Sequence, residues 1–254
     1  MKKNKSVPIL PEHRTQNTEH ISAPLPEHRT QNTEHISAPL PEHRTRNTEH
    51  ISASVHHPDS IIWSNGHVDR SQREHLLGQK GIVLWLTGLS GSGKSTIAVE
   101  VEKRLVAIGK LCYRLDGDNL RHGLNSDLGF SADERRENIR RVAEVAALFA
   151  DAGLITLVSF IAPYRDMRRF ARHRIGEDRF IEVYVKASVE VCKKRDPKGL
   201  YKMAESGEID QFTGVNAPYE IPENPDVILD TESTGLEQCV GVLFQEIRGR
   251  MAIE

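Results

Sequence analysis

Long apolar runs, cysteines and a strong net charge are all scarce in this sequence of 254 residues. No apolar stretch approaches the roughly 20 residues of a membrane-spanning helix, and no apolar segment follows the first lysines as in a secretory signal. The three cysteines, Cys112, Cys192 and Cys239, form neither a CxxC pair nor a zinc pattern. The net charge of −2 provides no basic field for nucleic acid or an anionic membrane. We therefore expect a soluble, cytoplasmic protein with free thiols and with no nucleic-acid or membrane partner.

Aromatic residues are missing from the segment before Trp63, which instead contains eight of the twelve histidines. After Trp63, apolar runs recur at regular intervals. A segment with few large apolar side chains does not bury enough surface to offset the entropy lost on ordering. The composition predicts a disordered tail over residues 1–60 and a folded domain over residues 61–254.

The predicted tail contains three copies of the fifteen-residue unit PEHRTQNTEHISAPL, at Pro11–Leu25, Pro26–Leu40 and Pro41–Val55. A packed solenoid would need an apolar face in every unit, and each unit offers only Ile, Leu, Ala and Pro. This favours a flexible tail. The alternative is a metal-binding or partner-binding tract that uses the repeated histidines, although no spacing places four ligands.

Strand-like and helix-like segments alternate after residue 80. Short runs rich in β-formers predict strands, and apolar residues at helical spacing predict the helices between them. The expected strands cover residues 81–87, 111–115, 154–160, 180–185 and 227–229, and the expected helices cover 96–108, 133–152, 164–175, 189–194, a turn at 200–205, and 236–248. The alternation predicts an α/β fold with a parallel central sheet covered on both faces, whose ligands bind beyond the carboxyl ends of the strands.

The segment GLSGSGKS at Gly88–Ser95 fits the P-loop pattern GxxxxGK[ST] between an expected strand and an expected helix. Its glycines let the backbone curl so that N–H groups face phosphate oxygens, and the following helix adds its positive end. Lys94 provides a positive charge for the β- and γ-phosphates of ATP, and Ser95 provides a hydroxyl for Mg²⁺. The residues predicted to bind ATP are Gly88, Leu89, Ser90, Gly91, Ser92, Gly93, Lys94, Ser95 and Thr96.

Two carboxylates and an arginine follow the second expected strand, in the segment Asp116-Gly-Asp118-Asn-Leu-Arg121. At this position they lie beside the phosphate site, where a kinase needs a carboxylate to orient and deprotonate the attacking hydroxyl. Alternatively, both aspartates are helix caps or turn formers.

Two phenylalanines lie in loops. Phe130, which precedes the helix at 133–152, is outside any apolar period and is expected either in the core or stacked on a base. Phe212 lies in the polar connection 208–225, whose length suggests a lid that excludes water from phosphoryl transfer. The alternative for this connection is a surface loop with one buried anchor.

Together these motifs resemble the adenylyl-sulfate (APS) kinase family. The matching segments are GHV at 66–68, LWLTGLSGSGKST at 84–96, LDGDNLR at 115–121, DLGFS at 127–131, ERRENIRR at 134–141, SFIAPYR at 159–165, KGLY at 198–201, FTG at 212–214, PYE at 218–220 and PENP at 222–225. The resemblance runs from about Ile61 to the last residue. It implies a P-loop kinase-like three-layer sandwich that uses ATP and Mg²⁺ to phosphorylate the 3′-hydroxyl of APS, giving PAPS and ADP in sulfate assimilation.

The resemblance also implies residue roles. Asp118 is expected to act as the base on the hydroxyl, with Lys94 at the phosphates and Asp116 near Mg²⁺ through water. The residues expected to bind APS are Asp118, Asn119, Arg121, Phe130, Arg135, Asn138, Ile161, Ala162, Lys198 and Phe212, with the two phenyl rings on either side of its adenine. Thr234 is expected to border the ATP adenine. A homodimer and an association with ATP sulfurylase are further expectations.

One position departs from the family pattern. Ala162 replaces the serine that many members have in Phe-Ile-Ser-Pro, the position of a suggested phosphoserine intermediate. We therefore expect direct in-line transfer, with Ser159 serving in strand packing rather than as a substitute nucleophile. Two alternatives stay open: another small-molecule P-loop kinase, of the gluconate or shikimate type, and a non-catalytic ATP-binding module.

Overall fold

Five parallel strands form one sheet in the order β2-β3-β1-β4-β5. The structure is a computed structural model that describes residues 62, 64 and 66–253, so the predicted tail and its repeats lie outside the described residues. The strands are β1 Val83–Thr87, β2 Cys112–Asp116, β3 Ile155–Ser159, β4 Phe180–Lys186 and β5 Val227–Asp230. The predicted α/β fold with a parallel central sheet is confirmed.

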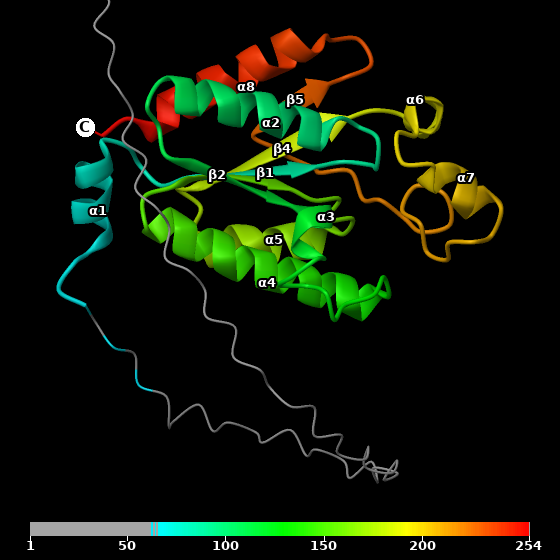
Figure 1. The fold of residues 1–254 in the computed structure, drawn as a ribbon, viewed down its shortest axis with the longest axis horizontal. Helices are drawn as coiled ribbons and strands as arrows, with labels where there is room; N and C mark the ends of the chain where they lie inside the picture. Colours follow the sequence, from blue (N-terminus) through cyan, green and yellow to red (C-terminus); the bar gives the residue numbers. More distant parts are fainter. Residues whose placement is uncertain (1–61, 63, 65, 254) are drawn as a thin grey trace, which may run out of the picture. The chain divides into compact units, whose positions relative to one another are not determined.

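Helices cover both faces of the sheet, with α2 and α8 on one face and α4 and α5 on the other (Figure 1). The helices are α1 Arg70–Leu77, α2 Lys94–Ala107, α3 Gly117–Leu120, α4 Ala132–Asp151, α5 Arg165–Ile175, α6 Val189–Arg195, α7 Leu200–Glu205 and α8 Leu236–Met251. In the part of the chain that is described, none of them is both long and apolar enough to cross a bilayer. The three cysteines are free thiols.

The central strand β1 explains why the core has two halves. Leu84 and Leu86 pack into the apolar cluster beneath α2 and α8, whereas Val83 and Trp85 pack into the cluster beneath α4 and α5. All five residues of β1 are buried. A strand covered on both faces is apolar at most positions, which is why residues 83–86 of β1 form an unbroken apolar run before Thr87.

Two helices were not predicted, and one begins earlier than predicted. Helix α1 has no buried residue, so its sequence has no apolar period. Its start is visible only in a capping box between Asp69 and Gln72. Helix α3 has four residues, too few for a periodic pattern. Helix α2 begins at Lys94 rather than Thr96, because the loop turns directly into the helix at Gly93.

Candidate active site

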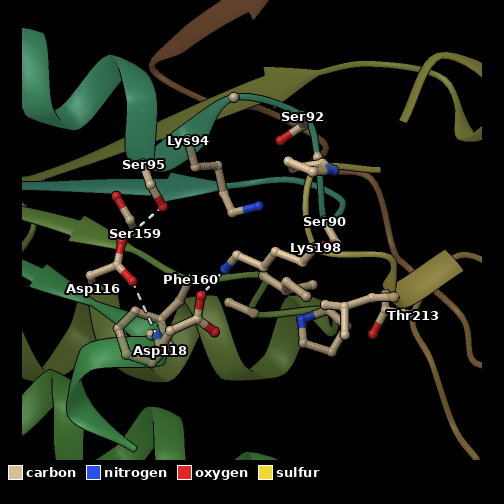
Figure 2. Close-up of a pocket in the computed structure, with 18 of the residues that line it drawn as sticks. Ser90, Ser92, Lys94, Ser95, Asp116, Asp118, Ser159, Phe160, Lys198 and Thr213 are labelled. Carbon is tan, nitrogen blue, oxygen red and sulfur yellow. Dashed lines mark hydrogen bonds and ion pairs between the residues drawn. The ribbon is translucent and has the colours of Figure 1, made fainter. Parts of the chain in front are cut away.

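A cavity of about 1290 Å³ lies at the carboxyl end of the sheet, where residues at the ends of β2 and β3 and after β1 and β5 line it. Cavities for one small ligand usually measure about 300–1,000 Å³. This cavity therefore has room for two ligands the size of nucleotides. Figure 2 shows the P-loop side chains, the carboxylates and the lid residues around it.

The P-loop between β1 and α2 needs glycine at defined positions. A side chain on Gly88 would place its Cβ 2.3 Å from the carbonyl oxygen of Val185, and Gly93 has a φ of 103°. Residues Ser90–Thr96 line the cavity. Gly88 and Leu89, which were also predicted to bind ATP, do not line it. Their carbonyl oxygens instead accept hydrogen bonds from the Lys94 amine.

The side chain of Lys94 is held by hydrogen bonds within the P-loop. Its Nζ donates to the carbonyl oxygens of Gly88 at 2.9 Å and Leu89 at 2.7 Å. The residue is only 8% exposed, and this burial lowers the pKa of its amine to about 8. A buried amine next to carbonyl groups lacks a full negative partner, which a phosphate in the cavity would provide.

Asp116 connects the ends of two elements. Its Oδ1 accepts a hydrogen bond of 3.1 Å from the Asp118 amide and caps α3, while its Oδ2 accepts one of 2.7 Å from the Ser95 hydroxyl. Asp116 is therefore a helix cap, as one sequence interpretation expected, and it also lies beside the P-loop, as the other expected. A hydroxyl and a carboxylate oxygen at the start of the P-loop helix are the donor types that Mg²⁺ prefers, so these residues fit the predicted metal.

Asp118 lies on α3 with its side chain 62% exposed, and its carboxylate forms an ion pair with Lys198. Lys198 comes from the connection between α6 and α7, so the two residues reach each other from opposite sides of the cavity (Figure 2). A carboxylate that accepts a proton from a substrate must be accessible, as Asp118 is.

Phe130 and two arginines, Arg121 and Arg135, form another part of the cavity lining. The Phe130 ring is 56% exposed, and the Arg121 guanidinium lies 4.1 Å from the ring centroid. Arg135 donates to the Phe130 carbonyl oxygen at 2.7 Å and to the Thr213 hydroxyl at 2.9 Å, and it also contacts the Gln211 carbonyl. Burial lowers the pKa of both guanidinium groups. An anionic ligand would offset the cost of burying these positive charges.

The four arginines at the start of α4 do not act as one cluster. Arg135 lines the cavity. Arg136 pairs with Asp166, while Arg140 and Arg141 pair with Glu137 on the helix surface.

The lid connection is anchored in the core by Phe212. This ring is 8% exposed and stands edge-on to Tyr201 with centroids 4.9 Å apart, yet it also lines the cavity. Phe212 is therefore a buried anchor, as the alternative interpretation expected, and it also lines the cavity, while the lid stays a prediction. The Tyr201 hydroxyl donates to the Ser90 carbonyl oxygen at 3.0 Å, which ties α7 to the P-loop.

The remaining predicted contacts lie in the cavity wall. Asn138 is 7% exposed and accepts a hydrogen bond of 2.6 Å from Asn125. The Ile161 carbonyl accepts one of 2.5 Å from the Thr87 hydroxyl. Ala162 has a φ of 43°, and its carbonyl accepts one of 2.7 Å from Arg168. These contacts fix the backbone at 161–162 along the wall.

The cavity brings together every predicted site residue other than Gly88 and Leu89, including Asn119 and Thr234. Sequence reasoning missed Arg195 and Thr231, which also line it. The Thr231 hydroxyl donates to the Ser92 carbonyl oxygen at 2.9 Å, and Arg195 donates to the Thr231 carbonyl oxygen at 2.6 Å. Their position after β5 and at the end of α6 is the signal that could have found them.

Comparisons with known proteins identify the family of the chain. The family profile described as Adenylylsulphate kinase matches residues 80–230. The adenylyl-sulfate kinase of Clostridium kluyveri is 57% identical over 185 residues, which cover 73% of this chain and 92% of that protein. The adenylyl-sulfate kinase of Staphylococcus epidermidis is 54% identical over 188 residues, which cover 74% and 94%.

A solved structure is also similar. The APS kinase of Mycobacterium tuberculosis in complex with AMPPNP and APS has a TM-score of 0.62 and 47% identity, covering 66% of this chain and 98% of that one. The matched family profile spans more than half of the chain, and the curated relatives are matched over nearly their whole length. The chain therefore belongs to the adenylyl-sulfate kinase family.

Proposed function

We propose that this protein transfers the γ-phosphoryl group of ATP to the 3′-hydroxyl of adenylyl sulfate, giving PAPS and ADP. The observation that carries this proposal is that one cavity is lined both by a P-loop and by an exposed phenyl ring with two arginines. A P-loop suits the phosphates of ATP. A phenyl ring and arginines suit a second nucleotide that carries negative charge.

On the ATP side, the amides of Ser90–Thr96 bind the phosphates. Lys94 exchanges the carbonyl oxygens of Gly88 and Leu89 for phosphate oxygens. Ser95 and Asp116, which are joined by a hydrogen bond, would hold Mg²⁺. When bound, the cation neutralises negative charge on the transferring phosphoryl group.

On the acceptor side, Asp118 orients the 3′-hydroxyl and accepts its proton. The carboxylate must first give up its ion pair with Lys198, which leaves the lysine free to contact the substrate. Arg121, Arg135 and Asn138 hold the phosphosulfate and ribose. The rings of Phe130 and Phe212 enclose the adenine.

The transfer is direct, from ATP to the hydroxyl. Ala162 has no hydroxyl group to form a phosphoenzyme, and it contributes only its backbone to the wall of the cavity. Positioning and charge stabilisation then account for the catalysis, as in other phosphoryl transfers.

The experiment is an assay of the purified chain with ATP and Mg²⁺ and one of three acceptors: APS, gluconate or shikimate. We expect ADP release with APS, together with PAPS as a separate product detected by chromatography. Activity only on gluconate or shikimate would replace the proposal with another small-molecule kinase. ATP binding without phosphorylation of any acceptor would support a non-catalytic module.

Three further expectations from the family belong to this proposal. They are a homodimer, an association with ATP sulfurylase and a cytoplasmic location. Light scattering of the purified chain tests the first, and co-purification with ATP sulfurylase from the source cells tests the second. Fractionation of the same cells tests the third.

A further inference from the structure

Ser159, the last residue of β3, has a buried hydroxyl for which the described part of the chain provides no hydrogen-bond partner. The residue is 4% exposed, and it lines the same cavity as Ser95 and Asp116. An unpaired buried hydroxyl is costly in free energy, so such a group in a native structure calls for an explanation. In this position the explanation is a ligand, an ion or a water molecule inside the cavity.

The sheet register places this hydroxyl beside the carboxylate of Asp116. Asp116 and Ser159 are direct partners in the parallel pairing of β2 and β3. Paired residues of parallel strands direct their side chains to the same face of the sheet. The Asp116 carboxylate in turn accepts the 2.7 Å hydrogen bond from Ser95. Figure 2 shows these three side chains next to one another at the start of α2.

The other face of β3 gives an internal comparison. Ser159 also pairs with Leu86 of β1, which packs toward α2 and α8, so the hydroxyl points to the P-loop helix. Val158 belongs instead to the apolar cluster under α4 and α5. At the carboxyl end of β3, the side-chain oxygen that faces the start of α2 is therefore that of Ser159.

The chemistry of this group fits the hydration shell of a divalent cation. Mg²⁺ usually keeps several of its waters and takes only one or two carboxylates from the protein. Waters on a dication are strong hydrogen-bond donors, and a serine oxygen accepts such a bond without adding another negative charge. In many P-loop enzymes an aspartate joins the P-loop serine at the metal. Here Asp116 has that position, and Ser159 adds a neutral oxygen beside it.

We propose that Ser159 is a positioning residue for the divalent cation, and that its hydroxyl holds a water of the cation's hydration shell. The inference rests on the proposed function, because it assumes a cation held by Ser95 and Asp116. Ser159 does not contact the reacting atoms, so its role is to fix the cation rather than to react. The proposed role of Ser159 goes beyond the strand packing that the sequence predicted for it.

The test compares Ser159→Ala with Thr156→Val. Thr156 is the matched control because it also lies on β3, is buried and has a hydroxyl without a partner, but it is not part of the cavity lining. The measured quantity is the affinity for Mn²⁺ in the presence of ADP, determined from the electron paramagnetic resonance signal of free Mn²⁺. We expect Ser159→Ala to weaken Mn²⁺ binding by about tenfold, as loss of outer-shell groups does at other metal sites. Thr156→Val should leave it unchanged.

Two controls separate cation binding from folding. Affinity for ADP without a divalent cation should be the same in Ser159→Ala and in the wild type. The variant Ser159→Thr, which keeps the hydroxyl, should restore Mn²⁺ binding. An equal Mn²⁺ affinity of wild type and Ser159→Ala would overturn the proposal, as would an equal loss of ADP affinity with and without the cation.

The outcome also separates this inference from the proposed function. PAPS formation by the wild type together with unchanged Mn²⁺ binding in Ser159→Ala would reject only the role of Ser159. Weakened Mn²⁺ binding in that variant, with no PAPS from the wild type, would keep the cation site and reject the reaction. A wild type that binds no Mn²⁺ with ADP would reject both.

Discussion

The hydroxyl of Tyr201 donates a hydrogen bond of 3.0 Å to the main-chain carbonyl oxygen of Ser90, so a residue of α7 is fixed to the P-loop. The ring of the same tyrosine stands edge-on to Phe212, with centroids 4.9 Å apart. Tyr201 thus contacts one group in the proposed ATP site and one in the proposed APS site. Binding of the first nucleotide would fix Tyr201 in place. The second nucleotide would then bind with a smaller loss of conformational entropy, because Tyr201 is already ordered.

We predict that Tyr201→Phe weakens the coupling between the two nucleotides. The variant keeps the ring against Phe212 and loses the hydrogen bond, which contributes roughly 0.5–1.5 kcal/mol. The factor by which ADP tightens APS binding should therefore fall about 2- to 13-fold. Calorimetric titration of APS with and without saturating ADP measures this factor.

The control for this prediction is Tyr113→Phe, because Tyr113 is 53% exposed and lies on β2 outside the cavity lining. It should leave the coupling unchanged. If Tyr201→Phe and Tyr113→Phe gave the same coupling as the wild type, the contact with Ser90 would have no part in communication between the sites.

The sequence predicted the strands to within one or two residues, because strands covered on both faces contain apolar runs such as residues 83–86 of β1. Helix α1 was not predicted because none of its residues is buried. Helix α3 was not predicted because it has only four residues. Periodicity detects an element only when one of its faces is buried over several turns.

The candidate site was predictable where a motif is local and not where it depends on distant segments. The P-loop and the pair Asp116 and Asp118 each lie within a few positions of one another. The contact between Tyr201 and Ser90 joins residues 111 positions apart, and Ser159 reaches Asp116 only through the register of two strands. Such contacts depend on tertiary packing, which spacing in the sequence does not encode.

We predict that Asp118→Asn lowers turnover by about 10² or more and leaves ATP affinity within about twofold. The amide keeps the shape of the side chain but does not accept the proton of the hydroxyl. Turnover is measured from initial rates of PAPS formation, and ATP affinity by titration. Lys198→Met is the companion variant, since it removes the ion pair and keeps the carboxylate.

Comparing turnover in the two variants separates a role of Asp118 as the base from a role of its ion pair with Lys198. If Asp118 is the base, the loss in Asp118→Asn should far exceed that in Lys198→Met at saturating substrate. Equal losses would indicate that the ion pair is what matters. Wild-type turnover in Asp118→Asn would remove Asp118 from proton transfer.

We predict that Phe130→Ala weakens APS binding by roughly 1–3 kcal/mol, the range for loss of stacking between a base and an aromatic ring. The ring is 56% exposed, so its removal should disturb the core little. Titration with APS in the presence of ADP measures the effect, and ADP affinity should not change. Phe170→Ala is the control, since Phe170 is 42% exposed on α5 and does not line the cavity. Equal APS affinity in both variants would mean that the Phe130 ring does not touch the base.

We predict that ATP affinity falls as pH rises above about 8. Burial lowers the pKa of Lys94 to about 8 in the free protein, and the phosphates of bound ATP raise it again. Above pH 8 the complex therefore holds more protons than the free protein, so binding takes up a proton and weakens by up to about tenfold per pH unit. Below about pH 7 the amine is protonated in both states and this dependence disappears.

Calorimetry in two buffers of different ionisation enthalpy measures the proton uptake directly. It should be close to zero at about pH 7 and approach one proton at about pH 9. Lys94→Met should bind ATP more weakly and without this change in uptake. Uptake that stays the same in Lys94→Met would assign the proton to another group.

We predict that removing residues 1–55 leaves PAPS formation within about twofold of the full chain, because the composition of this segment predicts a flexible tail outside the kinase domain. Among the described residues the cavity lining begins at Ser90, and the family match begins at residue 80. Initial rates and thermal unfolding of residues 56–254 test this.

Removing residues 1–79 is the contrasting truncation, since it also deletes α1 and the buried Gln79. The Gln79 amide donates to the Leu111 and Gly153 carbonyl oxygens at 2.8 Å. Both carbonyls would lose the hydrogen bond from Gln79, and the Leu111 carbonyl would keep only the one from the Ile155 amide, so this second truncation should lower the unfolding temperature. Loss of activity already in residues 56–254 would instead give the repeats a structural part in the kinase.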